Sequence, residues 1–317
     1  MHTTATATAP TTDPPLRRRR KIVYKGEAPL RNTVVLALIA FNLLLLVIPV
    51  GIAFAGSFHN WNPLSGVYDP VGLENYARMF TDPRLLRSLT NTTAFGVVVI
   101  VARVVIGLAL ALAIFSKATR FKTLFRAVFY MPTVTPLVAV AYVWKMMYDP
   151  QVGAINSFLG LDVNWLFDTT FALPAIMTMT IWKDFGYAVI LFLAGLYSLP
   201  EDVMEAAQMD GAGAWKRFWF VTFPLLRPMT IFVVITSLIS YLQAFIQVLV
   251  LTKGGPGSST FLISYLIYDE AFVKYNFGYA SAVAFALFLA TALLTALSFA
   301  LSGMRLPRRA DRQRKDS

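Results

Sequence analysis

The hydrophobic pattern divides the chain into six long apolar runs separated by polar segments. Each run is long enough to cross a bilayer, which takes roughly 20 apolar residues of helix. The first run is too long for the apolar core of a signal peptide, so we predict a retained helix there. Prolines, polar groups and charges interrupt the third and fourth runs and blur their ends. The six predicted spans are residues 33–56, 90–115, 124–147, 171–196, 229–251 and 279–303.

The composition also indicates a membrane protein. Of the 317 residues, 57% are hydrophobic and 14% are charged, whereas soluble domains have about 45–50% apolar and about 25% charged residues. The chain has no cysteine and two histidines, which excludes disulfides and a Cys/His metal cluster. We therefore expect an all-α membrane protein with six transmembrane helices and no metal site.

The positions of the basic residues predict the orientation, because Lys and Arg are enriched in cytoplasmic loops. Twenty of them lie in the two tails, after the second span and around residue 216, and five lie in the alternate loops. Both termini are therefore predicted to be cytoplasmic. This bias accounts for the net charge of +11, and no aromatic–basic platform indicates binding to nucleic acid.

The same pattern predicts the domain organisation. Residues 1–32 are expected to form a disordered basic tail, because residues 1–16 are mostly Thr, Ala and Pro without periodicity and basic residues follow them. Residues 33–303 should form the transmembrane domain, with a cytoplasmic loop at about 198–228. Residues 304–317 should form a second basic tail.

One polar segment, "EAAQMDGAGAWKRFWFVTFP" from Glu205 to Pro224, stands out in this apolar chain. A capping-box pattern at Ser198–Glu201 predicts a helix that begins there and runs to about Met209. Two glycines then break the helix, and residues 214–220 should form a second short helical stretch. The resulting hairpin is predicted to protrude into the cytoplasm, either to dock another protein or as an ordinary loop.

The hairpin resembles the EAA loop of ABC-importer membrane subunits, whose motif reads E-A-A-x3-G-x9-I-x-L-P. Val221 stands here for Ile and Phe223 for Leu. In that family the loop is the coupling helix, which sits in a cleft of the ATP-binding subunit. The resemblance therefore assigns ATPase coupling to Glu205, Ala206, Ala207, Asp210 and Gly211.

The resemblance covers most of the chain beyond the N-terminal tail. "VGLENYARMFTDP", "WKDFGYAVILFLAGLYSLPEDVMEAAQMDGAG", "LTKGGPGSST" and "YNFGYASAVAFAL" are all similar to the carbohydrate-uptake branch, close to the maltose and glycerol-3-phosphate permeases. It implies a type I importer (MetI-like) transmembrane domain in a prokaryotic cell membrane. The implied partners are a second homologous permease subunit, a dimer of ATP-binding subunits, an extracytoplasmic solute-binding protein and a sugar.

The chain carries no signature of an enzyme. "KGGPGSST" lacks the Walker A spacing, and two histidines leave no Ser/His/Asp or Cys/His set near a candidate nucleophile. We expect ATP and Mg to be used by the partner ATPase, with no cofactor bound by this chain. A stand-alone secondary transporter or channel is the alternative from another class, and a non-sugar or phosphorylated solute is the alternative within the importer class.

Polar groups inside predicted spans are candidates for solute contact, because they are costly in lipid. Sugars take aromatic faces and hydrogen-bonding side chains. Residues three or four apart share a helix face, so one face is expected for Asp184 and Tyr187 and another for Ser240, Gln243 and Gln247. The alternative is that these groups hold helices together without touching solute. The candidates for the solute pathway are Trp182, Asp184 and Tyr187 in the fourth span and Tyr241, Gln243 and Gln247 in the fifth.

Two basic residues lie at predicted membrane depth. Arg103 is near the middle of the second span and Asp184 near the middle of the fourth, so a direct Arg103–Asp184 pair is the favoured prediction. A site for an anionic group at Arg103 is the alternative. Lys183 adjoins Asp184 and is expected to compete for the same carboxylate.

Overall fold

The structure, a computed structural model, describes residues 27–116 and 118–302. Helices form most of it, and one two-stranded antiparallel hairpin joins them; η marks a π-helical turn. The elements in chain order are α1 (Glu27–Gly56), β1 (His59–Asn62), β2 (Val67–Pro70), α2 (Glu74–Met79), α3 (Pro83–Phe115), α4 (Lys122–Val134), α5 (Leu137–Met147), α6 (Ala154–Leu159), α7 (Ala172–Tyr197), α8 (Glu201–Met209), α9 (Ala214–Arg217), η1 (Phe218–Thr222), α10 (Phe223–Leu225), α11 (Arg227–Leu242), α12 (Ile246–Leu251), α13 (Ile263–Tyr268), η2 (Asp269–Val273) and α14 (Phe277–Ser302).

The described residues contain four to six candidate membrane spans. Four helices, α1, α3, α7 and α14, are long and apolar enough to cross a membrane by themselves. Two bent pairs raise the number to six if each pair is one span: α4 with α5, bent by 93°, and residues 214–225 with α11, bent by 63°. The all-α, six-span prediction is confirmed in this form.

The first helix is apolar on every side. Its 27 residues from Leu30 to Gly56 extend about 40 Å at 1.5 Å per residue, more than the roughly 30 Å hydrocarbon core of a bilayer. Because α1 begins at Glu27, residues 27–32 are helical and not part of a disordered tail. The rest of the predicted tails, residues 1–26 and 304–317, lies outside the described residues.

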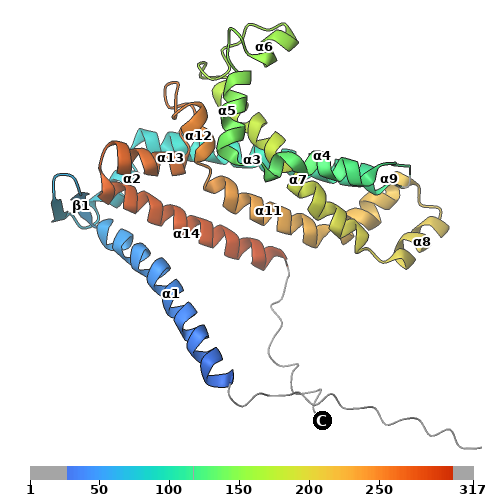
Figure 1. Cartoon of the computed structure of the whole chain (residues 1–317), viewed down its shortest axis with the longest axis horizontal. Coiled ribbons are helices and arrows are strands. Elements are labelled where there is room, and N and C mark those ends of the chain that lie inside the picture. The colour runs from blue at the N-terminus through green and yellow to red at the C-terminus, as the bar shows by residue number, and fades with distance from the viewer. Residues whose placement is uncertain (1–26, 117, 303–317) are drawn as a thin grey trace, which may run out of the picture. The chain divides into compact units, whose positions relative to one another are not determined.

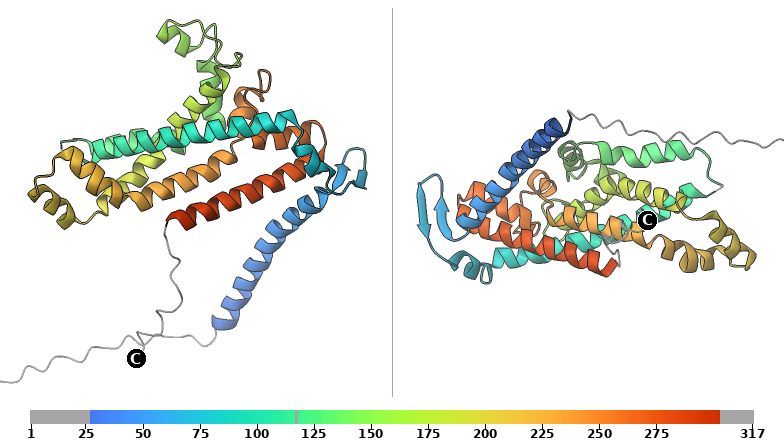
Figure 2. Two further views of the ribbon diagram at one scale, coloured as in Figure 1. Left: turned by 180° about the vertical axis from the view of Figure 1, so that it is seen from behind. Right: turned by 90° about the horizontal axis from the view of Figure 1, so that it is seen from below.

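The remaining helices form a bundle in which α4, α7, α3, α11 and α14 pack in succession (Figure 1). Figure 2 shows the same succession from behind. Glycines allow the closest approaches, as is common between membrane helices. A Cβ on Gly107 of α3 would lie 2.6 Å from the Cβ of Ala188 in α7, and a Cβ on Gly186 would overlap the backbone of Phe129 in α4. These contacts fix α7 between α3 and α4.

Two predicted spans are interrupted in the structure. The run at 124–147 breaks between Val134 and Leu137, because Pro136 pushes the preceding Thr135 into the extended conformation, with ψ 136°. The run at 229–251 was expected as one helix and is not: α11 ends at Leu242 and α12 begins at Ile246. The prediction that polar residues share one face across this break is therefore wrong.

The two ends of the bundle carry different loop structures. The α8–α9 hairpin lies at one end, and the β1–β2 hairpin with α2 lies at the opposite end (Figure 1). The helix predicted up to Met209 is confirmed as α8, but the capping box is not formed, because the Ser198 hydroxyl donates to the carbonyl of Gly195 at 2.8 Å. The β-hairpin was not predicted.

Candidate functional sites

A chain of hydrogen bonds links three helices at the depth of Arg103. Its Nη1 donates to Ser237 Oγ at 3.0 Å and to Tyr241 Oη at 3.3 Å, both on α11. Tyr241 Oη in turn donates to Asp184 Oδ2 on α7 at 3.1 Å. Arg103 is 6% exposed. We call Arg103, Ser237, Tyr241 and Asp184 the intramembrane chain.

The predicted direct pair between Arg103 and Asp184 is wrong. No bond or ion pair joins these two described side chains, because the Tyr241 hydroxyl lies between them and is bonded to both. Arg103 is further held by the ring of Tyr187, 5.2 Å from its guanidinium carbon, a favourable cation–π geometry. Its Nε is buried without a hydrogen-bond partner, so this N–H donor is unused.

Lys183 lies within ion-pair distance of Asp184, as predicted, and also binds a backbone carbonyl. Its Nζ donates to the backbone carbonyl of Thr133 in α4 at 3.1 Å, while its distance to Asp184 Oδ1 is 3.9 Å. The carboxylate of Asp184 is therefore nearer to Tyr241 than to Lys183. The side chain of Asp184 remains a quarter exposed, which makes it the most open charge of this group.

The structure brings some of the predicted solute residues together and separates others. Asp184 and Tyr241 are bonded to each other, and Tyr187 joins them through Arg103. Trp182 is exposed on the other side and packs its ring on Trp144 of α5, with centroids 5.6 Å apart.

The two glutamines are not part of this group. Gln243 lies in the break after α11 and lines an apolar groove between α11, α13 and α14, and Gln247 is buried in α12. The residue that sequence reasoning missed is Ser237, one helical turn before Tyr241. Its polar side chain in an apolar span is the signal that would have found it.

The α8–α9 hairpin presents its predicted coupling residues at the surface. Glu205, Ala206, Asp210 and Gly211 are exposed, and Ala207 is half-buried. Neither Glu205 nor Asp210 makes an ion pair with a described residue. Their carboxylates are thus free for a partner.

The turn of this hairpin explains the glycine at its centre. Ala212 N donates to Ala207 O at 3.1 Å and Gly211 N donates to Gln208 O at 3.0 Å, the two bonds of a Schellman motif. Gly211 occupies the left-handed position of that motif with φ +73°, where a side chain is strained. The predicted helix break is confirmed: a Schellman motif with Gly211 in the left-handed conformation ends α8.

A second polar assembly lies at the opposite end of the bundle, where two of the quoted sequence stretches meet. Asn75 Nδ2 donates to the carbonyls of Ser57 and His59 at 2.9 and 3.0 Å. Tyr279 Oη donates to Asp82 Oδ2 at 2.9 Å. Gly278 faces the backbone of His59 with no space for a Cβ. "VGLENYARMFTDP" and "YNFGYASAVAFAL" therefore interlock, and we call this assembly the outer clasp.

Glu270 is the buried centre of the outer clasp and is 1% exposed. Its carboxylate is bonded to Arg84, to Lys274 Nζ at 2.9 Å and to Asn276 Nδ2 at 3.3 Å, and Arg78 lies 3.7 Å away. Burial raises the pKa of the neighbouring Asp269, and the positive charge of Arg84 partly offsets that rise. The clasp thus neutralises buried acids with basic residues drawn from two distant parts of the chain.

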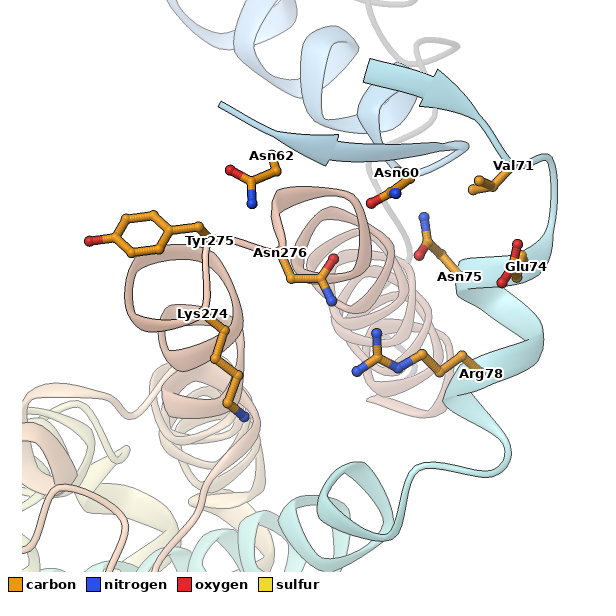
Figure 3. A pocket seen from close by; sticks show the side chains of 9 residues that line it. All are labelled: Asn60, Asn62, Val71, Glu74, Asn75, Arg78, Lys274, Tyr275 and Asn276. Carbon is orange, nitrogen blue, oxygen red and sulfur yellow. The ribbon is translucent and has the colours of Figure 1, made fainter. Parts of the chain in front are cut away.

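A polar cavity of about 340 Å³ opens beside this centre (Figure 3). The heads of Arg78 and Lys274 point toward it, and Glu74 and Asn60 lie along the other side. The cationic groups are already engaged by Glu270. The residues that line the cavity are Asn60, Asn62, Val71, Glu74, Asn75, Arg78, Lys274, Tyr275 and Asn276.

Residues 103–310 match the family described as the inner membrane component of binding-protein-dependent transport systems. The match covers more than half of the chain and includes the intramembrane chain, the α8–α9 hairpin and half of the outer clasp. The chain belongs to this family. Membership sets aside the alternative of a transporter or channel that works alone.

Curated relatives agree with this assignment. The chain is 35% identical over 249 residues to the multiple sugar-binding transport system permease protein MsmF of Streptococcus mutans, which covers 78% of this chain and 86% of the relative. It is 34% identical over 235 residues to the sn-glycerol-3-phosphate transport system permease protein UgpA of Agrobacterium fabrum, covering 72% and 79%.

A solved structure supports the fold. A bacterial alginate ABC transporter, in complex with an alginate pentasaccharide-bound periplasmic protein, has a chain that matches with a TM-score of 0.73 and 20% identity. The match covers 87% of this chain and 94% of that chain. The MetI-like importer fold predicted from the sequence is thereby confirmed.

Proposed function

We propose that this permease subunit forms half of the pathway of an ATP-driven importer for a neutral carbohydrate. Relatives at about one-third identity are named for sugar uptake and for sn-glycerol 3-phosphate uptake, so the choice lies between an uncharged and a phosphorylated solute. The observation that carries the choice is which charged side chains of the intramembrane chain, and of the neighbouring Lys183, are exposed enough to contact a solute.

The basic side chains near the proposed pathway are buried and bonded to protein groups, so they are not available to bind a solute. Arg103 is buried among Ser237, Tyr241 and Tyr187, and Lys183 is buried against the carbonyl of Thr133. The open charge is the carboxylate of Asp184, which repels a phosphate and accepts hydrogen bonds from sugar hydroxyls. Tyr187 adds an aromatic face of the kind that packs on sugar C–H surfaces.

The partners follow from the two ends of the bundle. We assign the exposed α8–α9 hairpin to the ATP-binding subunits, which would use ATP and Mg. A second homologous permease subunit would complete the pathway, and a solute-binding protein would dock at the end with the outer clasp. We also assign both termini to the cytoplasm, as the distribution of basic residues predicts.

Solute-stimulated ATP hydrolysis tests the proposal. The chain is reconstituted in proteoliposomes with its ATPase, permease and binding-protein partners and offered maltose, trehalose, lactose or sn-glycerol 3-phosphate. We expect a neutral sugar to stimulate hydrolysis and uptake, and Asp184→Asn to lower sugar uptake at least tenfold. Stimulation by glycerol 3-phosphate alone, with uptake unchanged or raised by Asp184→Asn, would overturn the neutral-sugar assignment.

A further inference from the structure

The bend between α4 and α5 lies at a point where helix carbonyls lose their partners. α4 ends at Val134, Thr135 is extended, and α5 leaves at 93°. The backbone carbonyls in the last turn of a helix have no N–H group of a following turn from which to accept a hydrogen bond. Inside a membrane such carbonyls need another donor from the protein.

Lys183 of α7 supplies that donor. Its Nζ donates to Thr133 O at 3.1 Å, and the Thr133 hydroxyl donates back to the carbonyl of Lys183 at 3.0 Å. Three residues further along α7, Gly186 lies directly against the α4 backbone at Phe129. The two bonds and the glycine contact together bind the C-terminal half of α4 to α7.

We infer that Lys183 is a positioning residue that holds the α4–α5 bend of this transporter. Its charge is balanced by the adjacent Asp184, 3.9 Å away, so a buried lysine is tolerated at this depth. Without the ammonium group, the end of α4 has an unpaired carbonyl and the bend loses its attachment to α7.

Two other lysines make the same contact at other helix ends and provide comparisons. Lys122 Nζ donates to Phe115 O at the end of α3, at 3.1 Å. Lys145 Nζ donates to Val250 O near the end of α12, at 3.2 Å. Favourable contacts between lysine and the C-terminal carbonyls of a helix are well known. Lys183 differs from both because it lies in the middle of a spanning helix and beside a partly open carboxylate.

The bend is connected through Lys183 and Asp184 to α11, the long helix that follows the α8–α9 hairpin in the chain. Asp184 is bonded to Tyr241 on α11, and α11 follows α8, α9 and α10 in the chain. On the other side of the bend, α5 places Trp144 against Trp182. Contacts through Asp184 and Lys183 therefore link α11 to the α4–α5 bend. This role rests on the transport function of the family and not on the choice of sugar.

The geometry of the bend can be measured directly, since the chain has no cysteine. Spin labels are attached to cysteines introduced at Val128 and Met146, which are both exposed. Pulsed electron paramagnetic resonance on the assembled transporter in nanodiscs then measures the distance across the bend. At 1.5 Å per residue and a 93° bend, the two Cα atoms are about 19 Å apart, against about 27 Å for a straight helix.

We expect Lys183→Met to broaden this distance distribution and shift it upward by several ångström. Lys183→Arg should restore the short distance, because a guanidinium can donate to the same carbonyl. Lys122→Met removes a comparable lysine–carbonyl contact elsewhere and should leave the distance unchanged. The measurement needs no transported solute, so it stands or fails independently of the proposed carbohydrate.

Two outcomes would overturn the inference. One is a wild-type distance distribution in Lys183→Met. The other is a shift in Lys183→Met that Lys183→Arg does not reverse and that Lys122→Met reproduces, since general destabilisation would then be the cause. If Lys183→Met does not assemble, Lys183→Gln serves instead, because its amide is a neutral donor that should keep most of the population at the short distance.

Discussion

The hydroxyl of Tyr241 joins the two charged members of the intramembrane chain, so Tyr241→Phe tests the whole arrangement with the removal of one atom. The ring, which packs edge-on against Phe95 with centroids 5.9 Å apart, is retained. The change removes the bond from Arg103 at 3.3 Å and the bond to Asp184 at 3.1 Å. Arg103 then has Ser237 as its remaining hydrogen-bond acceptor.

The expected loss follows from these two bonds. Hydrogen bonds between membrane helices contribute about 0.6 kcal/mol on average and at most about 1.7 kcal/mol. Two such bonds therefore give a loss of about 1–3 kcal/mol in the free energy of unfolding. We expect the upper half of that range, because both partners are charged and Arg103 already has an unpaired Nε.

The assay is reversible unfolding of the purified subunit in mixed micelles of mild detergent and SDS. Tyr142→Phe is the matched control, since Tyr142 is exposed on α5 and has no hydrogen bond to a described residue. A double-mutant cycle with Asp184→Asn isolates the Tyr241–Asp184 term. A loss for Tyr241→Phe within about 0.3 kcal/mol of the control, which is the usual error of additivity, would refute the bridging role.

Four further tests address other parts of the molecule. Gly211→Ala should destabilise the hairpin by about 1–2 kcal/mol, the cost of a left-handed residue with a side chain, and lower co-purification of the ATPase; unchanged stability would contradict the strained position. Glu205→Lys should leave the subunit folded but abolish coupled ATP hydrolysis, and hydrolysis at the wild-type level would remove Glu205 from the docking surface. Cysteines at Ser65 and Ser157 should react with an impermeant reagent from outside intact cells, and labelling of neither, with expression confirmed, would reverse the orientation. Glu270→Gln should cost about 3 kcal/mol, because it leaves the cations around a buried carboxylate uncompensated; a loss below about 0.5 kcal/mol would show that the outer clasp does not depend on its central charge.

The sequence predicts features that depend on neighbouring residues. Six apolar runs define the spans because spanning needs only length and hydrophobicity. The hairpin follows from its motif and from glycine, since the left-handed stop at Gly211 is a property of one residue and its own helix. Pro136 predicts an interruption at Thr135 for the same reason.

The local sequence does not predict the break between α11 and α12. No proline or glycine lies between Met229 and Leu251, so the apolar run reads as one helix although α11 ends at Leu242. The predicted face shared by Gln243 and Gln247 was lost with it. Packing of the segment after Leu242 against α5 and α7 decided this break.

Charge partners depend on the rotation and separation of helices, which a single sequence does not contain. Depth along the spans placed Arg103 near Asp184, but the hydroxyl of Tyr241 occupies the space between them. Glu270 and Arg84 are 186 positions apart in the chain and meet because α2, α3, η2 and α14 converge at one end.

The bend between α4 and α5 is determined partly by the local sequence and partly by tertiary contacts. Pro136 ends α4 through a local steric effect, and this the sequence alone determines. The direction of α5 has no local cause, because an extended residue before proline permits many angles. The 93° angle is decided by tertiary contacts, since Lys183 and Gly186 of α7 hold the end of α4 in place and α12 holds α5.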